Sequence, residues 1–482
     1  MTGPRRQPRR RQPLDPARRA AFDVLRAVSE RDAYANLALP ALLRERGISG
    51  RDAAFATELA YGTCRTRGLL DAVIGRAAGR PPDHIDSVLL DLLRLGTYQL
   101  LRTRVEAHAA VSTTVEQAGI EFDSARAGFV NGVLRTIAAR DELSWVDELA
   151  PDAATDPVGH VAFVRAHPRW IAQAFADALG ADAGQLDAAL AADNERPQVH
   201  LAARPGVLTG AELAAAVDGT AGRYSPYAVY LSGGDPGRLA PVRDGVALVQ
   251  DEGSQLVARA LTLAPIKGGD GGRWLDLCAG PGGKTALLAA IGAERGARVT
   301  AVEPMPRRAE MVEENTSGLR VEVLRVDARD SAIALRASGS SGAIGLRASG
   351  SSGGLAPGFD RVLIDAPCTG LGALRRRPEA RWRRQPSDVP ALAKLQRELL
   401  AAGIRLTRPG GVVLYATCSP HLAETIGVVA DALRRYSVRA LDARPLFGPG
   451  VAPQDLGDGP YVQLWPHRHG TDAMFAAALE VV

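Results

Sequence analysis

Residues 274–285 read Trp-Leu-Asp-Leu-Cys-Ala-Gly-Pro-Gly-Gly-Lys-Thr, an apolar run that passes directly into a loop rich in glycine. The run is typical of a parallel strand buried on both faces, and a helical pattern follows the loop. Glycines let the backbone approach a ligand closely, and a helix N-terminus favours negative groups. The loop does not match a phosphate-binding loop, because Cys278 stands where the first glycine of that motif belongs. The dinucleotide fingerprint is absent as well.

Further apolar runs alternate with helical stretches on both sides of this loop. The runs cover residues 274–278, 299–303, 321–326, 361–365 and 412–416. This repetition predicts a doubly wound, Rossmann-like α/β domain over residues 251–482. A tandem duplication interrupts it, since residues 332–342 read AIALRASGSSG and residues 343–353 read AIGLRASGSSG. We expect this insertion, 332–353, to form a flexible surface loop.

Two segments with other patterns precede this domain. Residues 16–145 carry apolar side chains at three- and four-residue spacing without strand alternation, which predicts an all-α domain. Residues 155–250 combine one helical stretch with short apolar runs among Gly and Pro. This mixture predicts a small α/β subdomain that links the two larger parts. The whole chain is therefore expected to be multidomain.

Composition limits the class of protein. Of 482 residues, 46% are apolar and 23% are charged, and no apolar run approaches the roughly 18 residues of a membrane span. The four cysteines include no Cys-x-x-Cys pair, so we expect neither a disulfide scaffold nor a zinc site. We expect a cytoplasmic protein that binds no metal and no membrane. Residues 1–15 form a basic, disordered arm, which suits a polyanion or serves as a solubilising tail.

Acidic residues stand at the ends of three predicted strands. They are Glu303, Asp327 and Asp365. In an open α/β sheet, ligands bind beyond the carboxyl ends of the strands, so these carboxylates are expected to converge on one crevice. A nucleoside with a short amino-acid tail, namely S-adenosylmethionine, would fit there. Each acid alone is equally typical of a helix cap.

Two cysteines follow neighbouring strands. Cys368 lies in Asp-Ala-Pro-Cys and Cys418 in Thr-Cys-Ser, both just past a predicted strand. A buried structural cysteine is the simplest interpretation of either one alone, as it is for Cys64 in the helical domain. A thiolate is also a strong nucleophile once its pKa is lowered. Its attack on C6 of a pyrimidine makes C5 nucleophilic, and C5 then accepts a methyl group.

A basic stretch follows Cys368 closely. Residues 374–384 combine many arginines with a tryptophan, which suits contact with phosphates and stacking on bases. A solvated charged face is the alternative interpretation. The predicted RNA-binding residues are Arg375, Arg376, Arg377, Arg381, Trp382, Arg383 and Arg384.

Three of these motifs together resemble the RNA cytosine-5 methyltransferase family. They are LDLCAGPGGKT at 275–285, DAPC at 365–368 and ATCS at 416–419. The helical region resembles the NusB-like RNA-binding domain through YGT at 61–63, LGTYQL at 95–100 and FVNGVLR at 129–135. The fusion is similar to the Sun or Fmu type of bacterial ribosomal RNA small-subunit methyltransferases. Further matches are NERP at 194–197, QDEGSQ at 250–255 and WPHR at 465–468.

The resemblance implies a role for each matching position. Cys418 would attack C6 of the cytosine, and Cys368 would help remove the C5 proton and release the enzyme. Asp365 would also bond the edge of the base, and Lys284 would act electrostatically. The residues that would hold S-adenosylmethionine are Cys278, Ala279, Gly280, Pro281, Gly282, Gly283, Lys284, Glu303, Arg308, Asp327 and Asp365.

Some positions depart from the family's pattern. Gly280 stands where alanine is usual, and Glu303 where aspartate is usual. After Cys418 the family often has a proline and paired acids, whereas residues 420–425 read Pro-His-Leu-Ala-Glu-Thr. These changes leave the ribose contact and the support of the nucleophile loop as open questions.

The resemblance favours a monomeric enzyme that makes 5-methylcytosine in 16S ribosomal RNA. The same chemistry on transfer RNA or another RNA is the first alternative. DNA methylation with Cys368 as the nucleophile is a second, and Thr417-Cys418-Ser419 argues against it. A third is a non-catalytic RNA-binding or antitermination factor with a decayed enzyme half. The intact cysteines and the intact glycine loop argue against this alternative.

Overall fold

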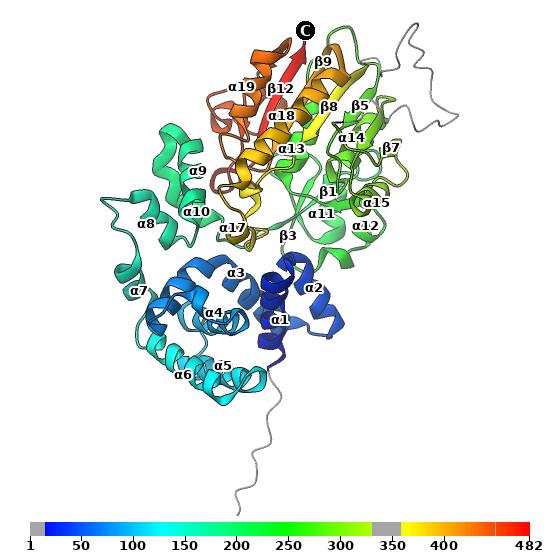
Figure 1. The fold of residues 1–482 in the computed structure, drawn as a ribbon. Helices are drawn as coiled ribbons and strands as arrows, with labels where there is room; N and C mark the ends of the chain where they lie inside the picture. Colours follow the sequence, from blue (N-terminus) through cyan, green and yellow to red (C-terminus); the bar gives the residue numbers. More distant parts are fainter. Residues whose placement is uncertain (1–14, 330–357, 449) are drawn as a thin grey trace, which may run out of the picture. The chain divides into compact units, whose positions relative to one another are not determined.

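The computed structural model describes residues 15–329, 358–448 and 450–482 (Figure 1). The predicted basic arm, except for Asp15, and the duplication at 332–353 lie outside the described residues. The chain divides into two compact units. The first comprises Met1–Gln173 and Arg376–Arg383, and the second comprises Ala174–Arg375 and Arg384–Val482.

The first unit is built from helices, as its three- and four-residue spacing predicts. They are α1 (Pro16–Arg31), α2 (Ala35–Glu45), α3 (Gly50–Ala78), α4 (Ser87–Arg102), α5 (Ala107–Glu121), α6 (Ser124–Ala138), α7 (Glu142–Leu149) and α8 (Pro157–Val164). The first begins where Asp15 accepts a hydrogen bond from Arg18 N, with Pro16 in the first turn. Fully buried residues such as Phe22, Leu59 and Leu134 form one core. The all-α prediction is confirmed.

Two of the short motifs in this unit meet in that core. Gly62 of α3 lies directly against the ring of Tyr98 of α4, where a Cβ atom would collide with the ring. The Tyr98 hydroxyl donates to Glu58 Oε1 at 2.5 Å. The glycine of one motif therefore makes room for the tyrosine of the other, and the pair sets how closely α3 and α4 pack.

The second unit opens with a small antiparallel sheet of order β2-β3-β1-β4. Its strands are β1 (Val199–Ala203), β2 (Thr220–Ala221), β3 (Ala228–Leu231) and β4 (Ala247–Val249). Helices α9 (Arg169–Leu179) and α10 (Leu186–Ala192) precede β1 in the chain, and α11 (Gly210–Val217) follows it. The short apolar runs at 198–203, 228–231 and 246–249 are thus strands, as the sequence predicts.

A larger sheet of order β10-β12-β9-β8-β5-β6-β7 follows. Strands β5 (Arg273–Asp276), β6 (Arg298–Val302), β7 (Val321–Leu324), β8 (Phe359–Asp365) and β9 (Thr407–Thr417) are parallel. They correspond to the five predicted runs. Strand β12 (Phe475–Val481) runs antiparallel to β9 and pairs with β10 (Val438–Leu441) and β11 (Val462–Gln463). The sequence did not predict these last three strands.

Helices cover both faces of this sheet (Figure 1). Trp274, Leu363 and Val412 pack in the same core as α13 (Glu252–Leu263) and α14 (Gly283–Ala293). Their neighbours along the strands, such as Leu275 and Val413, pack in the core with α18 (Asp388–Leu406) and α19 (Ile426–Arg435). Side chains of successive strand residues point to opposite faces, so both faces need apolar residues. The Rossmann-like prediction is confirmed.

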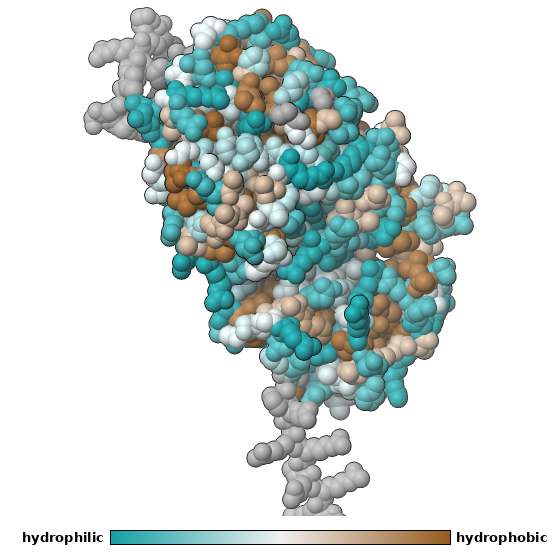
Figure 2. All heavy atoms as spheres, turned by 180° about the vertical axis from the view of Figure 1, so that it is seen from behind, coloured by the Kyte–Doolittle hydropathy of each residue, from teal (hydrophilic) through white to brown (hydrophobic). Residues whose placement is uncertain are grey.

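The surface drawn in Figure 2 is covered largely by hydrophilic residues, with hydrophobic residues in small groups between them. Among the described residues, no helix is both long and apolar enough to cross a membrane.

Candidate cofactor and catalytic site

The predicted site residues follow the carboxyl ends of parallel strands. The glycine loop follows β5, Glu303 follows β6, Asp365 ends β8 and Cys418 follows β9. Because these strands are parallel neighbours, their carboxyl ends lie along one edge of the sheet. The fold therefore brings these residues to one edge, where the sequence predicts the ligand crevice.

The glycine loop is held by hydrogen bonds to both sides. Gly282 has a φ of 109° at the start of α14, and a Cβ atom there would lie 2.9 Å from Val312 Cα. Thr285 Oγ1 donates to the buried Asp276 Oδ2 at 2.7 Å. Burial raises the pKa of Asp276 to about 6, although the Thr285 hydroxyl opposes this shift. Asn315 Nδ2 donates to Pro281 O at 2.8 Å, which ties the loop to α15 (Pro306–Asn315).

Glu303 reaches back to the glycine loop. Its Oε2 accepts from Gly280 N at 3.1 Å, and its Oε1 accepts from Met305 N at 3.0 Å. Arg308 Nε lies 3.4 Å from Oε2, and its Nη2 donates to Gly280 O at 2.5 Å. The Glu303 carboxylate and the Arg308 guanidinium thus both hold the glycine loop through the backbone of Gly280. Two of the departures from the family pattern, Gly280 and Glu303, are in direct contact.

This contact explains why the two departures occur together. A Cβ atom on Gly280 would collide with Glu303 Oε2 and come within 2.7 Å of Arg308 Nε. Glutamate is one methylene longer than aspartate, so its carboxylate needs the space that alanine would fill. Gly280 makes that space available to Glu303.

We expect Gly280→Ala to weaken S-adenosylmethionine binding by about 10-fold, because the clash displaces the Glu303 carboxylate. The double variant Gly280→Ala/Glu303→Asp is expected to recover most of that affinity. Isothermal titration calorimetry on the two single variants and the double variant measures the coupling. Additive losses in the double variant would contradict the compensation.

Lys284 and Asp365 form an ion pair at the middle of the edge. Lys284 Nζ lies 2.7 Å from Asp365 Oδ2 and donates to Ser254 Oγ at 3.1 Å. Burial lowers the pKa of Lys284, but the Asp365 carboxylate more than offsets this and leaves the pKa above its ordinary value. The ammonium group is therefore charged at neutral pH.

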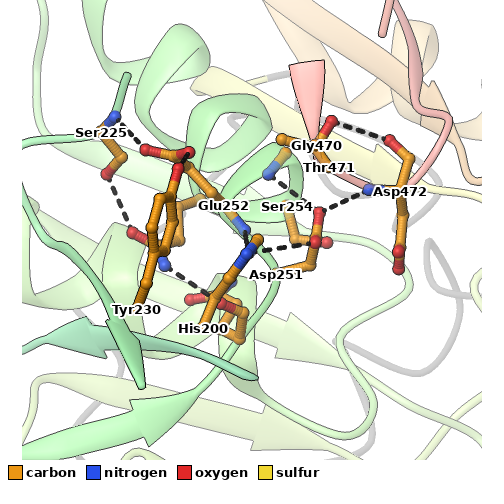
Figure 3. Close-up of polar contacts among 12 residues, drawn as sticks. His200, Ser225, Tyr230, Asp251, Glu252, Ser254, Gly470, Thr471 and Asp472 are labelled. Carbon is orange, nitrogen blue, oxygen red and sulfur yellow. Dashed lines mark hydrogen bonds and ion pairs between the residues drawn. The ribbon is translucent and has the colours of Figure 1, made fainter. Parts of the chain in front are cut away.

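Ser254 is held in place by a buried polar network (Figure 3). Asp251 Oδ1 accepts from Gly253 N at 2.9 Å and from Asp472 N at 3.1 Å, and Asp251 Oδ2 lies 3.3 Å from His200 Nδ1. Glu252 accepts from Ser225 N at 2.7 Å and from the Tyr230 hydroxyl. These contacts join the small sheet to the start of α13, on whose first turn Ser254 lies.

The two cysteines meet at the ends of β8 and β9. Their sulfur atoms are 3.4 Å apart, and both side chains are half-buried. The hydrogen bond with Cys418 and burial raise the pKa of Cys368 well above the ordinary value of a thiol. Burial likewise raises the pKa of Cys278, and it raises the pKa of Cys64 to about 12. Cys64 packs in the helical core, as expected.

A residue that the sequence analysis did not single out lies beneath the cysteines. Glu424 is fully buried, and its carboxylate accepts hydrogen bonds from Thr369 and Ser419, the residues that follow the two cysteines. Two sequence signals could have pointed to it: a hydroxyl residue after each cysteine, and the acid in the stretch after Cys418 where the family has paired acids.

Asp327 follows β7, but its carboxylate is engaged. Arg329 donates to it from its backbone N at 2.9 Å and from Nη2 at 2.6 Å, and these bonds lower the pKa of Asp327. The predicted cofactor contact of Asp327 stays a prediction.

The arginine-rich stretch is placed differently from the prediction. Arg375 is 8% exposed, with Nε donating to Asp472 Oδ1 at 3.0 Å and Nη2 donating to Gly470 O at 2.7 Å. Arg381 is fully buried, and its Nη1 donates to Ala166 O at 3.2 Å. Burial and these partners leave the two guanidinium groups little surface for phosphates, which counts against the predicted RNA contact of Arg375 and Arg381.

Residues 376–383 of this stretch belong to the first unit, whereas Arg384 belongs to the second. Trp382 Nε1 donates to Cys64 O at 2.8 Å, and Arg383 donates to Val28 O at 3.0 Å. Arg377 is exposed, with its guanidinium carbon 5.3 Å from the centroid of the Tyr34 ring. RNA contact by Arg376, Arg377, Trp382, Arg383 and Arg384 stays a prediction.

The groups at this edge fit S-adenosylmethionine. Glu303 offers carboxylate oxygens that suit ribose hydroxyls, the carboxylates suit a positively charged sulfonium, and a glycine loop begins α14. Within the described part of the chain, no group of three His, Cys, Asp or Glu side chains could hold a metal ion.

Comparison with known proteins agrees with this arrangement. Residues 260–480 match the family described as 16S rRNA methyltransferase RsmB/F, and residues 15–139 match the NusB family. A ribosomal RNA small subunit methyltransferase B of Pseudomonas putida is 35% identical over 88% of this chain and 91% of its own length. The chain belongs to the RsmB/F family of 16S rRNA methyltransferases. Proteins of this family are of the S-adenosylmethionine-dependent type.

Other relatives extend over nearly the whole chain. A putative methyltransferase of Mycobacterium tuberculosis is 77% identical over 99% of both chains. The crystal structure of PH0851 covers 97% of this chain and 99% of its own, with a TM-score of 0.75 and 21% identity. NSun6 from Pyrococcus horikoshii, solved with SFG, covers 66% of this chain and 99% of its own, with a TM-score of 0.52 and 17% identity. At these identities the two structures establish the fold alone.

Proposed function

We propose that this protein transfers a methyl group to C5 of a cytosine in 16S ribosomal RNA through a covalent adduct with Cys418. The observation that carries the proposal is the pair of thiols, 3.4 Å apart, at the same sheet edge as the Lys284–Asp365 ion pair. Two thiols at this separation can reach neighbouring ring atoms of one base. The match to the RsmB/F family supports the same chemistry.

The first step is the attack of the Cys418 thiolate on C6, which forms a C6–S bond and moves electron density to C5. Bound S-adenosylmethionine supplies an electrophilic methyl group to C5. The two sulfurs lie within hydrogen-bond distance, so Cys368 is placed to act on the base that Cys418 holds. Cys368 gives its own proton to solvent water and then, as the thiolate, takes the C5 proton. The C5–H electron pair forms the C5–C6 double bond, and the C6–S electron pair leaves on the Cys418 sulfur.

Lys284 and Asp365 orient the base in this scheme. The Asp365 carboxylate accepts from the exocyclic amine of cytosine, and Lys284, whose Nζ is 2.7 Å from Asp365 Oδ2, holds that carboxylate in place. Attack at C6 requires the base to leave its stack, so the substrate is single-stranded or flipped out.

Methylation of unmodified 16S RNA with methyl-labelled S-adenosylmethionine tests the proposal. Digestion to nucleosides is expected to place the label in 5-methylcytidine. Label in transfer RNA but not in 16S RNA would move the proposal to that substrate. Label in another nucleoside would overturn the cytosine chemistry.

A basic groove in the second unit supports an RNA substrate. Helices α18 and α19 pack side by side (Figure 1). The groove lies between them and encloses about 420 Å³. Five basic and two acidic side chains line it: Arg329, Lys394, Arg397, Arg405, Arg435, Glu398 and Asp431. Neither Arg397 nor Arg405 forms an ion pair with a described residue.

We expect Arg397→Glu/Arg405→Glu to weaken RNA binding by about 10-fold and to lower its salt dependence, because phosphate contacts release counterions. Filter binding over a range of salt concentrations measures both effects. Arg298→Glu/Arg434→Glu is the matched control, since it changes the net charge by the same amount at residues that do not line the groove. Equal losses in the two proteins would show that only net charge matters.

A further inference from the structure

Each reacting cysteine is followed by a hydroxyl residue, and the two hydroxyls meet on one carboxylate. Thr369 Oγ1 and Ser419 Oγ donate to Glu424 Oε2 at 2.5 and 2.7 Å. Thr369 N donates to Glu424 Oε1 at 2.8 Å. Glu424 has no exposed surface, and Thr369 and Ser419 are also buried. Glu424 therefore ties the backbone after Cys368 to the loop after Cys418, beside a direct contact of Thr369 Oγ1 with Ser419 Oγ at 3.1 Å and a hydrogen bond from Gly372 N to Cys418 O at 2.8 Å.

Other buried groups also donate hydrogen bonds to Glu424. Gln396 Nε2 donates to Glu424 Oε1 at 3.1 Å and to Pro367 O at 2.8 Å. The Tyr415 hydroxyl of β9 donates to Glu424 O at 2.7 Å. A buried carboxylate is retained only where donors satisfy both of its oxygens, as they do here. No described residue in these contacts competes with the cysteines for substrate.

We propose that Glu424 is a positioning residue that holds the Cys368 loop in place for the second half of the reaction. The inference rests on the proposed function. Glu424 lies in the same loop as Cys418, so the chain itself keeps those two residues near each other. The carboxylate accepts two hydrogen bonds from Thr369, in the loop after β8, and these are lost with it. Loss of the carboxylate therefore frees Cys368 more than Cys418.

Displacement of Cys368 affects one step of the reaction, the removal of the C5 proton. After methyl transfer, Cys368 takes the proton from C5, the C5–H electron pair forms the C5–C6 double bond, and the C6–S pair leaves on the Cys418 sulfur. A displacement of about 1 Å costs a proton transfer of this kind up to about 100-fold. Attack by Cys418 is less affected, so a covalent adduct between RNA and enzyme accumulates.

Glu424→Gln tests this, because glutamine has the same shape but turns one acceptor oxygen into an amide donor that faces other donors. We expect turnover to fall about 10- to 100-fold, with cofactor and RNA affinities unchanged. With RNA and S-adenosylmethionine present, an adduct that survives denaturing electrophoresis should accumulate, as in Cys368→Ala. A purely structural role would lower the melting temperature and the yield without trapping RNA.

Two further variants keep the test decisive. Thr369→Val removes the hydroxyl donor and should trap the adduct even if Glu424→Gln folds poorly. Thr425→Val is the matched control, because Thr425 is buried in the same loop but bonds His421 O rather than the carboxylate. Slow turnover without adduct in both Glu424→Gln and Thr369→Val would overturn the positioning role, provided that Cys368→Ala traps RNA. No adduct in Cys368→Ala would instead overturn the proposed function, and the inference with it.

Discussion

Cys418→Ala is expected to abolish methyl transfer, with a loss of about 10⁴-fold or more, whereas Cys368→Ala is expected to trap the RNA on the enzyme. Removal of a covalent nucleophile commonly costs a rate factor of this size. The two sulfurs are 3.4 Å apart, so geometry alone does not assign their order. The resemblance to the RNA cytosine-5 methyltransferases assigns Cys418 of the Thr-Cys-Ser motif as the nucleophile, and the two variants test that order. Single-turnover methylation and denaturing electrophoresis measure the two effects.

Cys64→Ala serves as the control for these variants. Cys64 is buried in the helical core and takes no part in the reaction, so its loss should change the rate by no more than a few-fold. The opposite pattern is also informative. An adduct in Cys418→Ala, and none in Cys368→Ala, would make Cys368 the nucleophile, which is the assignment expected of a DNA-type enzyme.

The fold could be predicted wherever buried elements leave a simple pattern of apolar residues in the sequence. The five parallel strands are short apolar runs with both faces covered, and each of the five predicted runs forms one of them. Strand β12 was not predicted from the sequence because it reads Phe-Ala-Ala-Ala-Leu-Glu-Val, and alanine favours helix. All of its residues are buried, so no alternation marked it as a strand.

The site could be predicted where topology places residues together. The carboxyl ends of β5, β6, β8 and β9 meet at one edge, so the loop, Glu303, Asp365 and the cysteines were expected near each other. Glu424 could not be found in this way, because its donors come from three separate segments. The prediction for Arg381 rested on arginine content, which says nothing about partners. Its guanidinium finds backbone carbonyls such as Ala166 O in place of phosphates.

Lys284→Met is expected to lower kcat/KM by about 100-fold or more, since the ammonium is the counter-ion of Asp365. Lys284 is 12% exposed, so its removal leaves a carboxylate that is 29% exposed without its partner. Loss of one member of a buried pair costs up to about 3–5 kcal/mol, and the partial exposure of Asp365 reduces that figure. We expect the melting temperature to fall and cofactor affinity to weaken together.

The double variant Lys284→Met/Asp365→Asn separates stability from chemistry. Asparagine carries no charge, so the double variant should regain most of the lost melting temperature. It should remain inactive, because neither the carboxylate nor its counter-ion is left to orient the base. Lys267→Met is the control, since Lys267 pairs with Glu480 while 64% exposed and should contribute little. Recovery of activity in the double variant would mean that the ion pair stabilises the fold and takes no part in the reaction.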